Sequence, residues 1–107
     1  MPTYELARFT VDPADVPQLV DAHPDLVAAV ASVTGALRRV TLVRIDERTF
    51  VDIAVWDSRE EAEAAVERIH EIPACHRFMA LIVDDQPVEY CEVVSDVEVD
   101  TSAVTRS

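Results

Sequence analysis

Hydrophobic and polar residues change their spacing once, sharply, in the middle of the chain. Over residues 49–57 the side chains alternate with a period of two, which predicts a strand. After Trp56 the apolar positions repeat at helical spacing, and Ser58 and Glu61 match the S-x-x-E capping box that starts a helix. We therefore expect a strand that ends in an aromatic residue and turns at once into a helix reaching about residue 72. A pocket can form at such a junction.

The rest of the chain supplies elements of the same two kinds. Asp12 and Pro13 end the first strand and favour the start of a helix. Pro17 and Pro24 are expected to interrupt the helical region that follows, leaving two short helices or a kinked one. Further strands are expected at 3–11, 36–46 and 88–95, further helical segments at 13–34 and 74–82, and turns at 46–48 and 84–87.

The order of these elements predicts the fold class. Strand, helix, two strands, helix and strand form the split βαβ, or ferredoxin-like, α+β arrangement: a four-stranded antiparallel sheet with helices on one face. A chain of 107 residues can build one modest core. We expect a single domain over residues 1–95, and a polar tail over 96–107 that is loose or forms an arm onto a partner.

The two faces of the predicted sheet differ in polarity. The mixed face combines large apolar groups with Arg8, Arg44, Asp52 and Glu92, which suits neither solvent nor a monomer core. We therefore predict a homodimer in which two such faces pack together, with Trp56 turned toward the partner. The uniformly apolar face is expected to meet the helices and carries Ala7, Phe9, Val11, Val43, Ile45, Val51, Ile53, Val55, Cys91 and Val93.

The charge of the chain excludes several partners. A net charge of −12 makes nucleic acid and anionic membranes poor partners, because phosphate binding needs clustered cations. No signal peptide or membrane-length apolar run is visible, so a cytoplasmic location is expected. Gly35 is the one glycine, so we expect no glycine-rich phosphate-binding loop and no cofactor. The two cysteines do not match the spacing of a metal site, so we expect free thiols and no metal.

Four segments carry a resemblance to a known family: residues 33–37 (Val-Thr-Gly-Ala-Leu), 50–56, 57–65 and 73–78 (Pro-Ala-Cys-His-Arg-Phe). Over residues 3–95 the chain resembles the dimeric α+β barrel superfamily, and most of all its antibiotic-biosynthesis-monooxygenase-type members. In cofactor-independent, quinone-forming members, a Trp, an Asn and a Tyr position an aromatic polyketide and dioxygen between sheet and helices. Trp56 stands at the position of that Trp, Asp52 at that of the Asn and Ala62 at that of the Tyr. Haem-degrading members need an Asn, which this chain lacks.

The candidate site combines this resemblance with the chemistry of the side chains. His76, near the start of the last helix, is the expected general base, with Trp56 and Asp52 as further catalytic residues. Simpler roles remain open for two of these residues: His76 as a partly buried structural histidine, and Trp56 as an aromatic residue of the interface or core. The residues expected to contact substrate are His23, Phe9, Phe78 and Met79.

The expected function is a small homodimeric enzyme, a cofactor-independent monooxygenase acting on a hydrophobic aromatic or polyketide-like molecule. Two alternatives stay open: a polyketide cyclase or isomerase of the same fold, and a non-catalytic accessory protein that binds a small molecule. A cavity between sheet and helices with His76 or His23 directed into it would favour an enzyme. A filled core there would favour the accessory protein.

Overall fold

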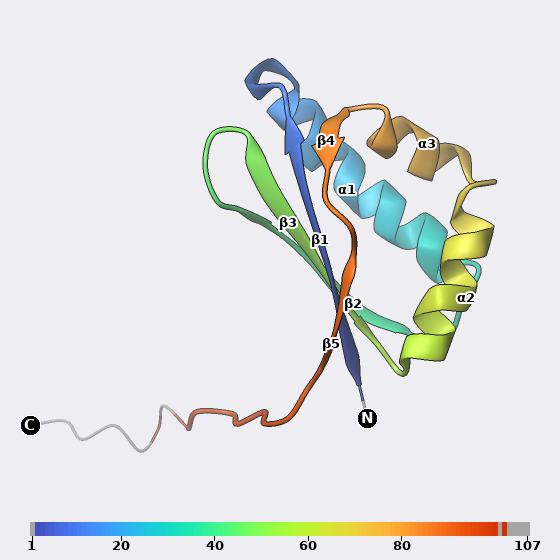
Figure 1. The fold of residues 1–107 in the computed structure, drawn as a ribbon, viewed down its shortest axis with the longest axis vertical. Helices are drawn as coiled ribbons and strands as arrows, with labels where there is room; N and C mark the ends of the chain where they lie inside the picture. The colour runs from blue at the N-terminus through green and yellow to red at the C-terminus, as the bar shows by residue number, and fades with distance from the viewer. Residues whose placement is uncertain (1, 101, 103–107) are drawn as a thin grey trace, which may run out of the picture.

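The computed structural model describes residues 2–100 and 102, and follows the predicted order of elements closely (Figure 1). The part of the predicted tail at 101 and 103–107 lies outside the described residues. The elements are β1 (Thr3–Val11), a short 3-10 turn η1 (Pro13–Asp15), α1 (Val16–Ala31), β2 (Leu37–Arg44), β3 (Thr49–Trp56), α2 (Arg59–Ile69), α3 (Pro73–Met79), β4 (Ile82–Asp85) and β5 (Glu89–Glu92).

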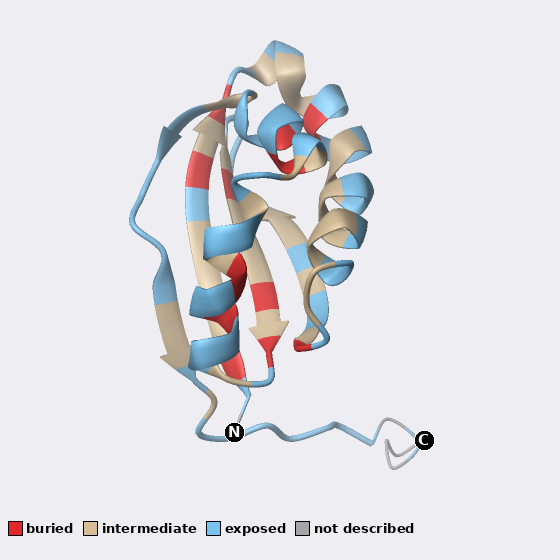
Figure 2. Ribbon diagram, turned by 90° about the vertical axis from the view of Figure 1, so that its right-hand side faces the viewer, coloured by how far each residue is buried: buried red, intermediate tan, exposed pale blue. Residues whose placement is uncertain are grey.

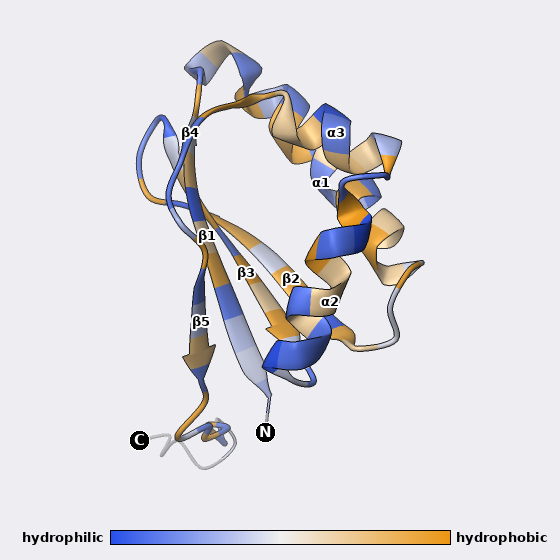
Figure 3. Cartoon of the chain, turned by 45° about the vertical axis from the view of Figure 1, so that its right-hand side comes forward, coloured by the Kyte–Doolittle hydropathy of each residue, from blue (hydrophilic) through white to orange (hydrophobic). Residues whose placement is uncertain are grey.

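The sheet has the antiparallel, ferredoxin-like arrangement predicted from the sequence. Its order is β2-β3-β1-β4, and β5 also pairs with β1, so β4 and β5 share one edge. The three α-helices lie together on one side of the sheet (Figures 1 and 3). Asp84 and Asp85, expected in a turn, belong to β4, and the last strand is shorter than predicted.

The helices begin where the sequence predicted, but the first is unbroken. Pro17 lies in the first turn of α1, where its missing N–H has no intrahelical partner to lose. Pro24 lies inside α1 without ending it, so of the two predicted alternatives the pair of short helices is wrong. Leu19, on the same helix, is completely buried, and such packing offsets the lost hydrogen bond. The capping box is confirmed, because the Glu61 N–H donates to the Ser58 hydroxyl at 3.2 Å.

Two apolar clusters fill opposite ends of the space between sheet and helices. At one end of the β1–β3 pair, Phe9 lies opposite Phe50; at the other, Thr3 lies opposite Trp56. The first cluster is aromatic, with the Phe9 ring 6.0 Å from Phe50 and 5.8 Å from Phe78. The second consists of Ala36, Ala54, Trp56, Ala62 and Ala65. Figure 2 shows the buried positions of α2 on the side that faces the sheet.

The register corrects the predicted faces of three strands. Residues directly opposite each other in antiparallel strands point to the same side of a sheet. Phe9 lies opposite Phe50 and Ala7 opposite Asp52, so the even-numbered residues of β3 face the helices. The prediction was right for β1 and wrong for β2, β3 and β5. The residues that it placed against the helices, among them Val51, Ile53 and Val55, lie on the open side.

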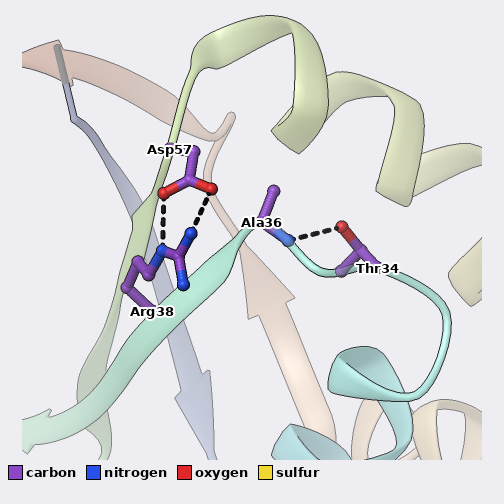
Figure 4. A network of polar contacts seen from close by, with 4 residues as sticks. All are labelled: Thr34, Ala36, Arg38 and Asp57. Atoms are coloured by element: carbon purple, nitrogen blue, oxygen red, sulfur yellow. Dashed lines mark hydrogen bonds and ion pairs between the residues drawn. The ribbon is translucent and has the colours of Figure 1, made fainter.

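The junction that leads Trp56 into the core is held by polar contacts at its edge (Figure 4). Both Asp57 oxygens accept from the Arg38 guanidinium at 2.6 Å. The Asp57 N–H donates to the Ala36 carbonyl at 2.9 Å. The Ala36 N–H donates to the Thr34 hydroxyl at 3.1 Å. The nearby Arg38 lowers the pKa of Asp57. An exposed ion pair adds little stability, so its main effect is to align β2 with the end of β3.

Candidate functional site

A cavity of about 250 Å³ lies between the sheet and the helices. Residues of β1, β2, β3 and all three α-helices line it, most of them apolar. Glu5, Ala7 and Asp52 line the stretch of wall between the two apolar clusters. The space is therefore open rather than filled by core side chains, which meets the first part of the expectation for an enzyme; the second part is a His76 or His23 side chain directed into the cavity.

Asp52 and His23 form a polar pair at this wall. Nε2 of His23, on α1, lies 2.9 Å from Oδ1 of Asp52, on β3, and both side chains are largely buried, at 13% and 17% exposed. Burial raises the pKa of Asp52, and the hydrogen bond and charge of His23 oppose that rise. Asp52 lines the cavity and His23 does not, so His23 reaches a ligand only through the carboxyl.

Trp56 and Glu5 form a second polar pair on the same wall. The indole Nε1–H of Trp56 donates to Oε1 of Glu5 at 2.8 Å, and Trp56 is 4% exposed. Burial raises the pKa of Glu5, the Trp56 hydrogen bond lowers it, and repulsion from Asp52 raises it further. Trp56 thus faces the helices and the cavity, which corrects the prediction that it turns toward a partner subunit.

Glu5 is the polar residue that the sequence analysis missed. The period of two that places Ala7 and Phe9 toward the helices also places Glu5 there. A single charged side chain on that strand face was the available signal. Its partner Trp56 could not be inferred, because the two residues are 51 positions apart in the chain.

The other predicted residues lie around the same cavity, at different depths. Phe9 and Phe78 are buried and line it while completing the aromatic cluster. Met79 also lines it and is 52% exposed. His76 lines it from α3 but is exposed, and its Nε2 contacts the carbonyl oxygen of His70. The cavity therefore brings together Asp52, Trp56, His76, Phe9, Phe78 and Met79, with His23 behind Asp52.

Two of the four charged residues predicted on the partner-facing side of the sheet, Arg44 and Asp52, contact other groups of the same chain. Asp52 lies on the helix side and pairs with His23. The Arg44 guanidinium donates to the carbonyl oxygens of Asp46 and Glu47 in the β2–β3 turn, each at 3.1 Å. These contacts leave Arg44 holding a turn rather than a carboxylate.

Two further features bear on the class of site. Within residues 2–100 and 102, no group of three or more His, Cys, Asp or Glu side chains is arranged to hold a metal ion. The described helices also include none long and apolar enough to span a bilayer. Cys75 is buried and lines the cavity, and burial raises the pKa of its thiol, which disfavours the reactive thiolate.

Comparison with known proteins shows that the chain shares its fold with several solved structures. No protein-family model and no curated protein sequence matches the chain. SnoaB, a cofactor-independent oxygenase from Streptomyces nogalater, is a similar solved structure, with a TM-score of 0.71, 21% identity, and coverage of 90% of this chain and 96% of SnoaB.

Two other solved structures agree with this placement. One, described as an antibiotic biosynthesis monooxygenase, has a TM-score of 0.67 at 17% identity and covers 87% of this chain and 99% of its own. The other, a dimeric ferredoxin-like protein from an uncultured marine organism, has a TM-score of 0.68 at 13% identity, over 92% of this chain and 93% of its own. The resemblance drawn from the sequence is thus confirmed as a shared fold.

Proposed function

We propose that this protein is a small enzyme that oxygenates an aromatic or polyketide-like substrate without a cofactor, with Asp52 as the proton acceptor. The observation that carries the proposal is the position of Asp52, which lines a mostly apolar cavity and pairs with His23 at 2.9 Å. A shielded proton acceptor of this kind is what deprotonation of a phenol or an activated methylene needs. The shared fold with SnoaB, a cofactor-independent oxygenase, supports the same reaction class.

Asp52 suits the role of base because its surroundings favour proton uptake. Burial raises its pKa, which makes the carboxylate a better proton acceptor than an exposed one. An ionised carboxylate only accepts hydrogen bonds, so Nε2 of His23 carries the hydrogen and fixes the orientation of Asp52. His76 is exposed with one ring nitrogen already against a carbonyl, and its assignment as base remains a competing prediction.

The proposed reaction converts a ring-activated methylene to a carbonyl. Asp52 takes one proton from the methylene, and the resulting carbanion is stabilised by the neighbouring aromatic rings. The carbanion gives its electrons to dioxygen and forms a carbon–oxygen bond. Loss of the second hydrogen as a proton, with cleavage of the oxygen–oxygen bond, releases water. One dioxygen and the two methylene hydrogens thus become one carbonyl oxygen and one water. The Trp56 ring, which lines the cavity, offers a stacking surface for the substrate.

The proposed active form is a homodimer built through the open side of the sheet. That side carries half-buried apolar residues, which a solvent-facing sheet surface does not favour. They include Leu6, Val43, Val51, Ile53 and Val55. A similar structure is described as a dimeric ferredoxin-like protein, which supports the same assembly here.

The test is oxygen uptake by the purified protein with anthrones and hydroquinones, without added cofactor or metal. Asp52→Asn should lower the rate about 100-fold or more, because a positioned base contributes at least that factor. Asp21→Asn makes the same chemical change at an exposed position of α1 and should leave the rate unchanged. A large loss in His76→Ala without one in Asp52→Asn would make His76 the base. No uptake above the spontaneous rate would rule out the oxygenase.

A cyclase or isomerase is favoured by the same acid–base groups and needs no oxygen. Glu5 and Asp52 both line the cavity, so one carboxyl could remove a proton while the other returns it. Consumption of a substrate at the same rate with and without dioxygen would select this alternative.

A further inference from the structure

Two carboxyl groups project from neighbouring strands into the cavity. In the β1–β3 register, Glu5 lies opposite Ala54 and Asp52 opposite Ala7, so Glu5 and Asp52 are diagonal neighbours on the helix side. Diagonal neighbours in antiparallel strands have side chains about 7–8 Å apart. Their mutual repulsion contributes to the raised pKa of Glu5. The cavity wall therefore presents two partly buried acidic groups at separate points, and Asp85 borders the cavity at an exposed position.

Each carboxyl keeps one oxygen available to a ligand. Trp56 donates to Oε1 of Glu5, and His23 contacts Oδ1 of Asp52. Within the described chain, Oε2 of Glu5 and Oδ2 of Asp52 accept no hydrogen bond, yet neither is sealed away from solvent. Both residues line an otherwise mostly apolar cavity. A ligand with two hydrogen-bond donors would satisfy both oxygens, and one without them would leave two acceptors desolvated and unpaired.

The inner surface offers no arginine or lysine to a negatively charged ligand. The chain contains no lysine, and among the described residues Arg8 is the one arginine that borders the cavity. Arg8 lies between Ala7 and Phe9, which face the helices, so its exposed side chain lies on the open side of the sheet. His70 and His76 border the cavity at exposed positions. A ligand carboxylate would therefore face like charges without a matching cation.

We propose that the cavity selects uncharged or cationic aromatic ligands with two hydrogen-bond donors, such as a hydroxyl at each end of a fused ring system, and excludes carboxylates. Glu5, together with Asp52, sets this specificity. The inference rests on the proposed function only in taking this cavity as the ligand site. It narrows the substrate class to polyphenols or aminophenols without an acid group.

The experiment compares two ring systems of the same size by isothermal titration calorimetry. The wild-type protein should bind 2,6-dihydroxynaphthalene at least about tenfold more tightly than 6-hydroxy-2-naphthoate, since one unpaired or repelled charge costs at least that factor. Glu5→Gln keeps the shape and removes the charge, so it should reduce this preference at least about threefold. Glu67→Gln, at an exposed position of α2, should keep the wild-type ratio.

If Glu5→Gln fails to fold, Asp52→Asn provides a second test, and it should reduce the ratio of diol to naphthoate affinity by the same factor. Three results would overturn the inference: equal or tighter binding of the naphthoate, an unchanged ratio in the folded variants, or no detectable binding of the diol. Binding of the diol with no oxygen uptake by any anthrone would overturn the proposed reaction and leave the specificity intact.

Discussion

The hydrogen bond between Trp56 and Glu5 makes a quantitative prediction about non-additive stability. The donor is 4% exposed, and the donor–acceptor distance is 2.8 Å. Glu5→Leu leaves a buried indole N–H without an acceptor, which costs about 1–3 kcal/mol. Trp56→Phe leaves the carboxyl without its donor and part of the ring volume empty, for a loss of about 2–4 kcal/mol. Each single variant should therefore be clearly destabilised.

The double variant should lose less than the sum of the two single losses. Removing both partners leaves no unpaired polar group, and replacing a buried pair by apolar groups is close to neutral. Because Glu5 is only partly buried, we expect a coupling at the lower end of the range for charged hydrogen bonds, about 1–2 kcal/mol. Lowering the pH until Glu5 is protonated should reduce the coupling, because a neutral acceptor binds the N–H less strongly.

The assay is urea unfolding followed by far-UV circular dichroism, since two of the variants lack the single tryptophan. All four proteins are compared at one protein concentration, because dimer formation would make stability concentration-dependent. Losses that add to within about 0.5 kcal/mol would show that the two side chains act independently. That result would refute both the hydrogen bond and the reasoning that Glu5 holds Trp56 in place.

Two further predictions concern Asp52 and the open side of the sheet. Because burial raises the pKa of Asp52 above its ordinary 3.8, its stabilising contribution is fully present below that value and is lost as pH rises through the folded pKa. As the pH rises from acid to neutral, the free energy of unfolding of Asp52→Asn, measured in urea, should therefore increase relative to that of the wild type. A difference that does not change with pH would contradict burial as the cause. Ile53→Lys puts a charge on an inner strand of the open side and should convert the proposed dimer to a monomer in analytical ultracentrifugation; a dimer that persists in this variant would place the interface elsewhere.

The sequence was sufficient for the order of the main elements, although it did not predict the short strand β4. The capping box at Ser58 and Glu61 located the start of α2, because cap residues act on neighbouring backbone groups. The element order predicted the ferredoxin-like sheet with helices on one side. Most of the residues selected as a candidate site, including Asp52 and Trp56, do line one cavity.

Only the tertiary structure decided which way β3 faces. Both halves of its alternating pattern contain large apolar residues, so the period of two predicts a strand without saying which side is buried. The pairing of Phe9 with Phe50 decides it, since it joins the larger rings into one cluster. The same decision turns Asp52 and Trp56 inward and leaves Val51, Ile53 and Val55 on the open side.

The two polar pairs of the cavity wall could not be predicted from the sequence either. Asp52 and His23 are 29 positions apart, and Trp56 and Glu5 are 51 apart, so no local spacing connects them. The local sequence pattern predicts whether a residue lies in a helix or a strand and which residues share its face. The partner of a buried polar group depends instead on strand register and on how a helix crosses the sheet, and both are set by packing between segments distant in the chain.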